Sequence, residues 1–390
     1  MTKKFRLSTL MSVLLLLSFS LAACSGGKNG AEDLGISSDI ASLDDGETRI
    51  VLLINGNLGD MSFFDSANAG MQAFQADHPE VQVKVVEMGV DTSVWEPTLR
   101  QTANEANDLI IIGTTDMREP LQRLIQTQKY PDRKFIIFDT EIKDNAAEEY
   151  PQVHSIMFRQ NEGGYLAGAV AALMSIETGA TRTGFIGGMR IDVINDFGFG
   201  FMQGVQKVNE DFDAEVLSYN AYIGDFFNSP KGKSLADTMY TEGQVNILFA
   251  AASQAGLGSL DSAKNLNEYI IGVDTDQYDY FSQTDPAKAS RIVTSVLKRV
   301  DLALYEACED FLAGTLTYGD LVILGLTDGK VGIVDNENYQ SIVPQEYRAY
   351  VQQLIDQIGS GELVIKSGLK RYTPIDEVNA LFDQLDPTKQ

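Results

Sequence analysis

Carboxylates stand at or close after the ends of three apolar runs in this sequence. Asp139 ends the run FIIFD, Asp274 ends YIIGVD, and Asp60 follows RIVLLI within a few residues. One carboxylate can accept hydrogen bonds from two adjacent hydroxyls. These side chains therefore suit a neutral, hydroxyl-rich ligand, to which Lys298 can also donate while it balances the charge of Asp274.

Aromatic residues accompany these carboxylates. Phe63 and Phe64 follow Asp60 in GDMSFF, and a second group in the later half of the chain contains Tyr222 and Phe226. A heteroaromatic base held between rings from two sides would gain affinity from both. Each residue alone is equally well explained as a helix cap, a core ring or a solvated lysine, so the binding hypothesis depends on their convergence.

The common catalytic motifs do not fit. The GKS at 232–234 resembles the end of a phosphate-binding loop, but Phe227 stands where that loop requires glycine. The glycines within 198–204 have the spacing GxGxxxG and fall inside a helical pattern, unlike the dinucleotide-binding turn. No G-x-S-x-G motif is present.

A metal site is not expected either. Asp274, Asp276 and Asp279 form the densest acidic group, but a calcium loop of the EF-hand type would need glycine at 279. An aspartate that caps the turn after a strand is the favoured interpretation. With two histidines in the chain, a zinc site is improbable, and no cofactor is predicted.

The elements that must position these residues alternate along the chain. The run at 50–54 consists of β-branched residues and leucine without polar alternation, which predicts a strand buried on both faces. Further strands are predicted at 81–87, 109–113, 135–139, 154–158, 183–187, 216–220, 246–250 and 269–273. Helical patterns lie between them, at 66–76, 94–106, 118–128, 161–176, 197–209, 231–241 and 256–265. This order predicts an α/β protein with parallel, doubly wound sheets, in which ligands bind beyond the carboxyl ends of the strands.

Two lobes are expected, because about 340 residues exceed what one core usually covers. We assign 48–160 and roughly 293–390 to lobe one, and 161–292 to lobe two. Within the C-terminal part we expect a helix over 293–312, followed by a return of the helix at 347–358 to lobe one. A chain that crosses several times between lobes predicts a multi-strand hinge beside a ligand cleft.

The N-terminus resembles a secretory signal. Residues 1–23 carry Lys3, Lys4 and Arg6 before an apolar run, and small residues precede Cys24 as in the lipobox of bacterial lipoproteins, where that cysteine is acylated. Residues 24–47 are rich in glycine, serine and aspartate and predict a flexible tether. An uncleaved membrane anchor is the alternative, but the apolar run is short for a span. We expect a monomer anchored by lipid on the extracytoplasmic face of the cell membrane.

Composition limits the partners. The formal net charge of -25 disfavours nucleic acid and anionic lipid surfaces. Beyond Cys24 the chain has one further cysteine, Cys308, which lies in an apolar helical pattern and is expected in the core.

Eight short motifs occur in a characteristic order: GDMSFFDSANAGM at 59–71, FRQNEGGYLAG at 158–168, GFIGGM at 184–189, FGFGFMQGV at 197–205, GDFFNSPKGKSLA at 224–236, AGLG at 255–258, GVDTDQ at 272–277 and TSVLKRVD at 294–301. Together they resemble the basic membrane protein family of bacterial lipoproteins, the purine nucleoside-binding components of ABC transporters. The resemblance implies a type I periplasmic-binding fold, in which two Rossmann-like lobes close on a nucleoside and deliver it to a membrane permease.

The resemblance also implies roles for residues. Asp60 and Asp139 would address the ligand from lobe one, and Phe226 would stack on the base. The ribose would be held by Gly256, Asp274 and Lys298.

Two positions of this chain depart from the family pattern. Phe64 stands where the family commonly has asparagine, and Asn68 stands where it often has an aromatic residue. Both are candidate ligand neighbours, and the ring from lobe one would then be Phe63 or Phe64.

Two alternatives remain open at the level of sequence. One is an enzyme, a nucleoside hydrolase that uses the aspartates at 274–279 with calcium. It is disfavoured because Tyr280 and Phe281 follow where further aspartates are needed. The other is a receptor of the same fold for a sugar or a signalling molecule.

Overall fold

The structure is a computed structural model that describes residue 41, residues 46–142 and residues 146–390. The predicted signal segment, Cys24 and most of the predicted tether lie outside the described residues.

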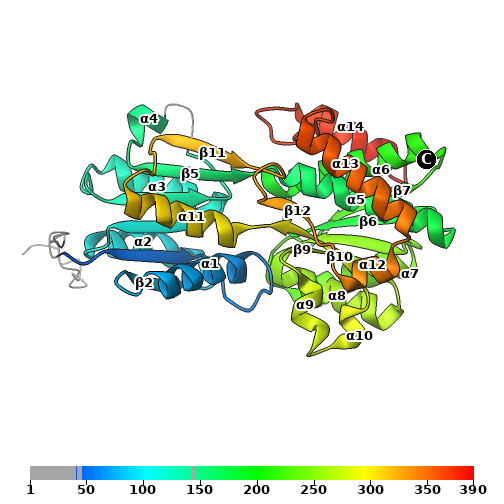
Figure 1. The fold of residues 1–390 in the computed structure, drawn as a ribbon, viewed down its shortest axis with the longest axis horizontal. Helices are drawn as coiled ribbons and strands as arrows, with labels where there is room; N and C mark the ends of the chain where they lie inside the picture. Colours follow the sequence, from blue (N-terminus) through cyan, green and yellow to red (C-terminus); the bar gives the residue numbers. More distant parts are fainter. Residues whose placement is uncertain (1–40, 42–45, 143–145) are drawn as a thin grey trace, which may run out of the picture. The chain divides into compact units, whose positions relative to one another are not determined.

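The described chain forms two six-stranded sheets (Figure 1). The first has the order β11-β5-β4-β3-β1-β2 and the second the order β12-β10-β9-β8-β6-β7. The strands of the first sheet are β1 (Arg49–Ile54), β2 (Gln82–Glu87), β3 (Leu109–Gly113), β4 (Lys134–Phe138), β5 (Val153–Phe158) and β11 (Asp320–Leu324). Those of the second are β6 (Arg182–Gly187), β7 (Leu217–Tyr222), β8 (Ile247–Ala251), β9 (Tyr269–Asp274), β10 (Ile292–Lys298) and β12 (Val331–Ile333). Neighbouring strands are parallel except β10 and β12. The carboxyl ends of most strands, here called their exits, therefore lie along one edge of each sheet.

Helices surround each sheet. Lobe one, built on the first sheet, contains α1 (Phe63–Asp77), α2 (Trp95–Asn104), α3 (Thr115–Gln126), α4 (Ala146–Glu149) and α11 (Val300–Ala313), with a short 3₁₀ turn at Thr92–Val94. Lobe two contains α5 (Gln160–Thr178), α6 (Asp192–Phe212), α7 (Ser229–Thr241), α8 (Ser253–Leu266), α9 (Gln277–Ser282), α10 (Pro286–Ala289), α12 (Glu337–Ile342), α13 (Gln345–Ser360) and α14 (Ile375–Leu385).

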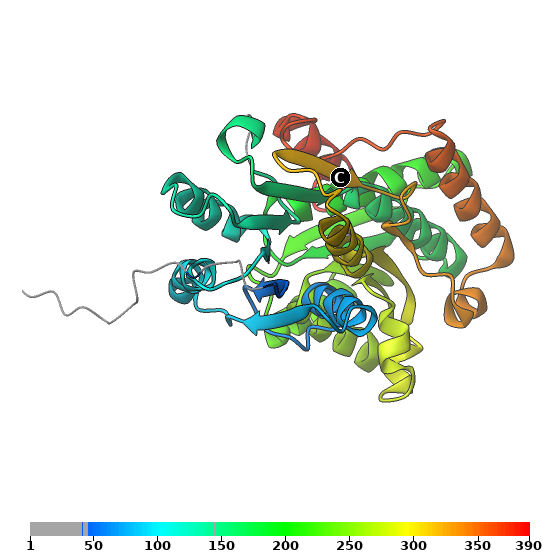
Figure 2. The same cartoon turned by 60° about the vertical axis from the view of Figure 1, so that its left-hand side comes forward.

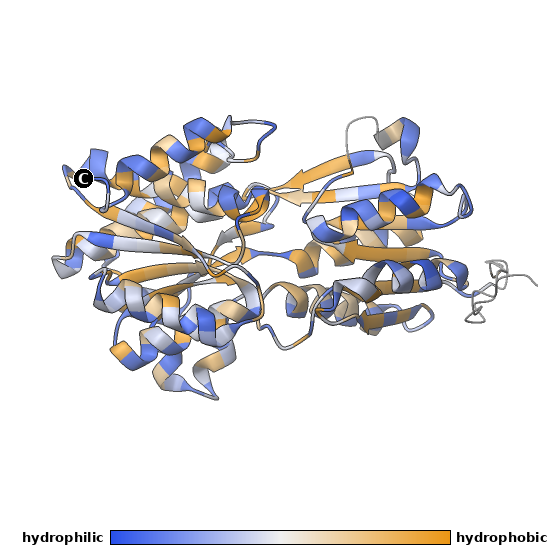
Figure 3. Cartoon of the chain, turned by 180° about the vertical axis from the view of Figure 1, so that it is seen from behind, coloured by the Kyte–Doolittle hydropathy of each residue, from blue (hydrophilic) through white to orange (hydrophobic). Residues whose placement is uncertain are grey.

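Strand β1 has no polar alternation in its sequence, and its packing gives the reason. Ile50, Leu52 and Ile54 enter one core with α1 and α11, whereas Val51 and Leu53 enter a second core on the opposite face with α2 and α3. Both faces of the strand are therefore covered by helices, as the continuous apolar run predicts. Figure 3 shows the same property as orange strands beneath helices of mixed colour.

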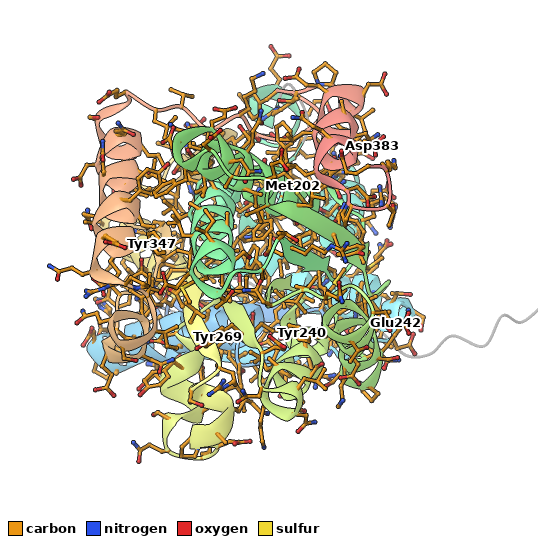
Figure 4. The ribbon with its side chains drawn as sticks, turned by 90° about the vertical axis from the view of Figure 1, so that its right-hand side faces the viewer. Met202, Tyr240, Glu242, Tyr269, Tyr347 and Asp383 are labelled. Carbon is orange, nitrogen blue, oxygen red and sulfur yellow. The ribbon has the colours of Figure 1, made fainter. Side chains whose placement is uncertain are left out.

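Helices α5 and α6 pack unusually closely in lobe two. A Cβ atom added at Gly200 would lie 2.1 Å from the carbonyl oxygen of Asn161, and one at Gly168 would lie 2.0 Å from that of Phe201. Gly200 and Gly204, two glycines of the GxGxxxG pattern, thus allow two helix backbones to touch. Helix α5 also contacts α13, and Met202 of α6 and Tyr347 of α13 belong to the same core (Figure 4).

The described chain passes between the sheets three times: from β5 to α5, from β10 to α11 and from β11 to β12. The crossings are tied to one another by backbone hydrogen bonds, since Arg159 N donates to Leu324 O and Arg299 N donates to Lys330 O, each at 2.8 Å. The fold class predicted from sequence, two parallel-dominated α/β lobes joined by several crossings, is confirmed.

The expected helix over 293–312 is wrong for its first part. Residues 292–298 form β10, and the helix α11 begins at Val300. The β-branched residues Ile292, Val293, Thr294 and Val296 favour a strand, and their side chains are fully buried in the second sheet. Lys298 consequently ends a strand.

The C-terminal part also differs from expectation. Only α11, which packs against α1 (Figure 2), and β11 belong to lobe one, while β10, β12, α12, α13 and α14 belong to lobe two. The apolar residues of α13 and α14, among them Leu354 and Phe382, complete the core around α5 and α6. These two helices are therefore held in lobe two by burial of apolar surface.

Candidate functional site

A cavity of about 860 Å³ lies between the lobes and is lined by residues of both. Its wall includes the exits of β1, β3 and β4 from lobe one and of β8, β9 and β10 from lobe two. This is the place where a parallel α/β sheet binds ligands, because the strand exits and the helix starts meet there. The volume lies within the range of small-molecule sites.

A buried ion pair forms part of the cavity wall. The ammonium of Lys298 donates to a carboxylate oxygen of Asp139, which leaves β4 opposite it. The ammonium also lies 5.2 to 5.5 Å from the ring centroids of Phe63, Phe158 and Phe197, at a distance suited to cation–π attraction. Burial raises the pKa of Asp139, and the Lys298 charge opposes that rise. The pair thus places one donor and one acceptor, both largely shielded from solvent, on the cavity wall.

Asp274 lies at the exit of β9 and accepts a hydrogen bond from the Ser62 hydroxyl of lobe one. Its side chain is buried, and this desolvation raises its pKa to about 7, against the attraction of Lys298. The carboxyl group is therefore poised between its neutral and charged forms near neutral pH. A ligand hydroxyl that donates to it would favour the charged form.

Asp60 lines the cavity, and its carboxylate already accepts several hydrogen bonds within the protein. Its two oxygens accept from the backbone N–H groups of Ser62, Phe64 and Asp65, at 3.0 to 3.1 Å, and from the Ser253 hydroxyl of lobe two at 2.7 Å. The bonds from Phe64 and Asp65 satisfy backbone N–H groups in the first turn of α1, and the bond from Ser62 holds the residue before it. Asp60 lines the cavity, but its acceptors already hold the loop before α1 and tie it to lobe two.

Two glycines leave space for aromatic rings on the cavity wall. A Cβ at Gly56 would lie 2.4 Å from the ring of Phe64, and one at Gly188 would lie 2.3 Å from the ring of Phe226. Each ring therefore rests directly on backbone. Phe63 also lines the cavity but is engaged in the core, since it stacks on Phe138 at 5.5 Å and meets the edge of Phe64 at 5.3 Å.

Four residues of the wall have left-handed backbone conformations: Thr114, Asp139, Ser253 and Asp274, with φ between 48° and 69°. Each stands where a strand leaves its sheet or where the next helix begins. Such a conformation is unfavourable for residues other than glycine and persists only where the surroundings enforce it. These four strained backbone positions all line the cavity.

Further hydrogen bonds join the lobes beside the cavity. Met61 O accepts from Thr275 Oγ1 at 3.0 Å and from Gln277 Nε2 at 3.2 Å. Farther away, Arg371 forms an ion pair with Glu141 at 2.6 Å. Asp276, one of the aspartates considered for calcium, accepts a hydrogen bond from the backbone N–H of Asp279 and so caps α9.

The structure brings most of the predicted site residues to this cavity. Seven of the nine candidates line it: Asp60, Phe63, Phe64, Asp139, Phe226, Asp274 and Lys298. Asn68 and Gly256 are outside its lining. Asn68 lies within α1, and Gly256, expected in a turn, is buried in the first turn of α8.

Other residues of the wall were not predicted from the sequence, among them Asn55, Trp95, Thr114, Arg118 and Ser253. Asn55 and Thr114 follow β1 and β3 directly. Asp139 was predicted because it is a carboxylate at a strand end, and the same criterion would have found Asn55 and Thr114 if it had included amides and hydroxyls. Trp95 and Arg118 are helical residues, and no local pattern indicates which helix faces the cavity.

Comparison with known proteins identifies the family. The sequence profile of the Bmp family, described as ABC transporter substrate-binding protein PnrA-like, matches residues 47–363. The chain belongs to the Bmp family. This protein is accordingly a substrate-binding protein of an ABC transporter, and the members of its family are solute-binding proteins, not enzymes.

Relatives of this Bmp protein align over most of their length. It is 30% identical to the CD4+ T-cell-stimulating antigen of Listeria innocua, covering 91% of this chain and 97% of the relative. It is 27% identical to basic membrane protein A of Borreliella burgdorferi, covering 94% and 98% respectively. Proteins of the family are extracytoplasmic and membrane-associated.

Solved structures agree with the fold. A solute-binding protein of an ABC transporter system from Aeropyrum pernix K1 superposes with a TM-score of 0.74 at 26% identity, covering 86% of this chain and 98% of the other. A solute-binding protein from Actinobacillus succinogenes with bound D-allose has a TM-score of 0.56 at 15% identity, covering 76% and 100%, and so supports the fold alone. None of the helices in the described part of this chain is both long enough and apolar enough to cross a membrane.

Proposed function

We propose that this Bmp protein binds a nucleoside, with a purine as its base, between its lobes and presents it to the permease of its transporter. The observation that carries the proposal is the composition of the cavity wall, where groups that bind hydroxyls and faces of aromatic rings occur together. A nucleoside needs both, because its sugar is rich in hydroxyls and its base is a flat heterocycle.

The hydroxyl-binding groups come from both lobes. Asp274 and the pair of Asp139 with Lys298 supply acceptors and a donor within a buried region. A hydrogen bond between a hydroxyl and a desolvated carboxylate is stronger than one between neutral groups. The ribose would therefore lie at this end of the cavity and would draw the two lobes together.

The ring faces also come from both lobes. Phe64 stands on lobe one and Phe226 on lobe two, and Trp95 contributes to the lobe-one wall with its indole N–H bonded to Gly89 O at 2.9 Å. A base between Phe64 and Phe226 would be stacked on two faces. Phe64 is the lobe-one ring in this proposal, a choice supported by the stacking of Phe63 on Phe138.

We further propose that Cys24 carries the lipid that attaches the chain to the membrane, with 24–47 as the tether. The support is the order of charged, apolar and small residues before that cysteine. Mass spectrometry of the membrane-extracted protein should find an acylated N-terminal cysteine, and Cys24→Ala should release the chain from the membrane fraction.

Thermal unfolding against a panel of ligands tests the nucleoside assignment. A nucleoside at a concentration of one hundred times its Kd should stabilise the chain by about 2.7 kcal/mol. Sugars provide the comparison, and incubation with inosine followed by an assay for free base provides a control for hydrolysis. Stabilisation by sugars alone, or release of base in turnover amounts, would contradict the proposal.

A further inference from the structure

Two buried polar atoms on the lobe-one wall have no partner in the described structure: Asn55 Oδ1 and Arg118 Nε. Asn55 is 6% exposed, and its Nδ2 donates to Thr114 Oγ1 at 2.8 Å, which leaves the amide oxygen unused. Arg118 forms no ion pair with any described residue. A buried polar atom without a partner costs stability, so a ligand that supplies the missing partners is favoured.

The strand register fixes where these atoms lie relative to the ion pair. Residues 53 and 112 are aligned in β1 and β3, and Gly113 is aligned with Phe138 in β4. If both alignments are extended past the last paired residues, Asn55 after β1, Thr114 after β3 and Asp139 after β4 lie side by side. Since strands are about 4.8 Å apart, Asn55 lies about 10 Å along the sheet edge from Asp139. A ligand whose hydroxyls meet Asp139 and Lys298 must extend past a single sugar ring to reach Asn55.

Arg118 belongs to the same end of the cavity. It stands in the first turns of α3, the helix that begins directly after Thr114, and it lines the cavity together with Asp116. The wall at this end therefore offers an acceptor from Asn55 and a planar fork of donors from Arg118. Asp116 adds a carboxylate, and desolvation raises its pKa.

We propose that Asn55 and Arg118 select the base, and that the preferred ligands are nucleosides of 6-oxopurines, such as inosine and guanosine. The inference rests on the proposed function and specifies its substrate class. A 6-oxopurine presents O6 and N7 as two adjacent acceptors, which a guanidinium fork binds in a bidentate manner. Its N1–H lies on the other side of O6 and donates to the amide oxygen of Asn55.

Other bases do not match this pattern. Adenine has an amino group in place of O6, so one branch of the Arg118 fork would face a donor, and its N1 is an acceptor that would face the Asn55 oxygen. Uracil offers an N–H beside a carbonyl but lacks N7. A site whose polar groups are left unpaired by the wrong ligand discriminates more strongly than a hydrophobic pocket does.

Calorimetric titration of the mature protein with inosine, guanosine, adenosine, uridine and guanosine 5′-monophosphate tests the inference. The two 6-oxopurine nucleosides should bind at least about tenfold more tightly than adenosine or uridine, a difference of about 1.4 kcal/mol. Arg118→Met keeps an unbranched apolar stem and removes the guanidinium donors, and Asn55→Ala removes the acceptor. Each variant should reduce the ratio of adenosine to inosine Kd to within about threefold.

Arg348→Met, at an arginine of α13 in lobe two, is the matched control and should leave the ratio unchanged. Melting of each ligand-free variant shows that it folds. Equal affinity for inosine and adenosine in the unmodified protein would overturn the inference while leaving the proposed function intact, whereas failure of all nucleosides to bind would overturn the proposed function itself. Tightest binding of the monophosphate, lost in Arg118→Met, would show that Arg118 binds a phosphate and would also overturn the inference.

Discussion

Asp274 shows how burial at a single residue connects ligand binding to pH. In the ligand-free protein desolvation raises its pKa to about 7, whereas an aspartate in an unfolded chain titrates near 3.9. The folded chain therefore binds a proton between these two values. As a result, the contribution of Asp274 to stability falls as pH rises from about 4 to 7. A ribose hydroxyl that donates to the carboxylate reverses this preference, because it stabilises the charged form.

We expect nucleoside affinity to rise with pH through the pKa of Asp274. Between pH 6 and 8 the Kd should fall by about tenfold or somewhat less, since one proton is released on binding below pH 7. Asp274→Asn should weaken binding and remove most of this dependence, and Asp279→Asn, at an exposed residue of α9, should change neither. Titration calorimetry at the two pH values measures both effects, and equal Kd values at pH 6 and 8 would argue against contact between Asp274 and the ligand.

At the scale of elements, the contact of α5 with α6 depends on glycines whose neighbours are backbone atoms. A side chain at Gly200 would meet the carbonyl oxygen of Asn161 at 2.1 Å, and a backbone carbonyl cannot turn away as a flexible side chain can. Because α5 begins directly after the crossing from β5, its position also sets the geometry of the hinge.

Gly200→Ala should therefore destabilise the protein, by about 2 to 3 kcal/mol or more, as overpacking forces the helices apart. Gly359→Ala in α13 is the matched control, since its Cβ would approach no atom closer than 3.9 Å. That change should be neutral or should stabilise by up to about 1 kcal/mol, the gain expected when alanine replaces glycine in a helix. Urea unfolding of both variants measures the difference, and similar stabilities would show that α5 and α6 can separate without cost.

At the scale of the whole molecule, the fold extends past the part that matches the family. The family profile ends at residue 363, but the chain beyond it packs onto lobe two. Val378, Phe382 and Leu385 of α14 are buried in its core, and Ser367 and Gly368 donate to the buried carboxylate of Asp196. This C-terminal segment, 364–390, also carries Arg371, the partner of Glu141 in lobe one.

A chain that ends at residue 363 should lose more than about 5 kcal/mol of stability, because several buried apolar side chains contribute about 1.5 to 3 kcal/mol each. Val364→Ser in the full chain is the control: this side chain is 79% exposed, and its replacement should change stability by less than about 0.5 kcal/mol. Denaturant unfolding of the two proteins provides the comparison. A truncated chain as stable as the full one would mean that the segment is an appendage without a structural role.

The sequence by itself determined the alternation of strands and helices, the α/β class and the three acidic strand ends. These depend on local periodicity and on the rule that parallel strands deliver their exits to one edge. The departure of β10 from its expected helix was also encoded locally, in the β-branched residues at 292–296. Only the tertiary structure decided which lobe received α13 and α14, because apolar helix faces fit any core that is open to them.

Tertiary structure likewise separated residues that look alike in the sequence. Asp60 and Asp274 both follow apolar strands and line the cavity. Asp60 accepts hydrogen bonds from the start of α1 and from Ser253, whereas Asp274 accepts a single bond, from Ser62, among those described. Asn55 and Arg118 carried no local signal as a pair. They became a candidate site only in the tertiary structure. There the register of β1 against β3 aligns Asn55 with Thr114, helix α3 brings Arg118 to the same cavity, and Asn55 Oδ1 and Arg118 Nε have no partner among the described residues. Register is set by contacts between strands distant in sequence.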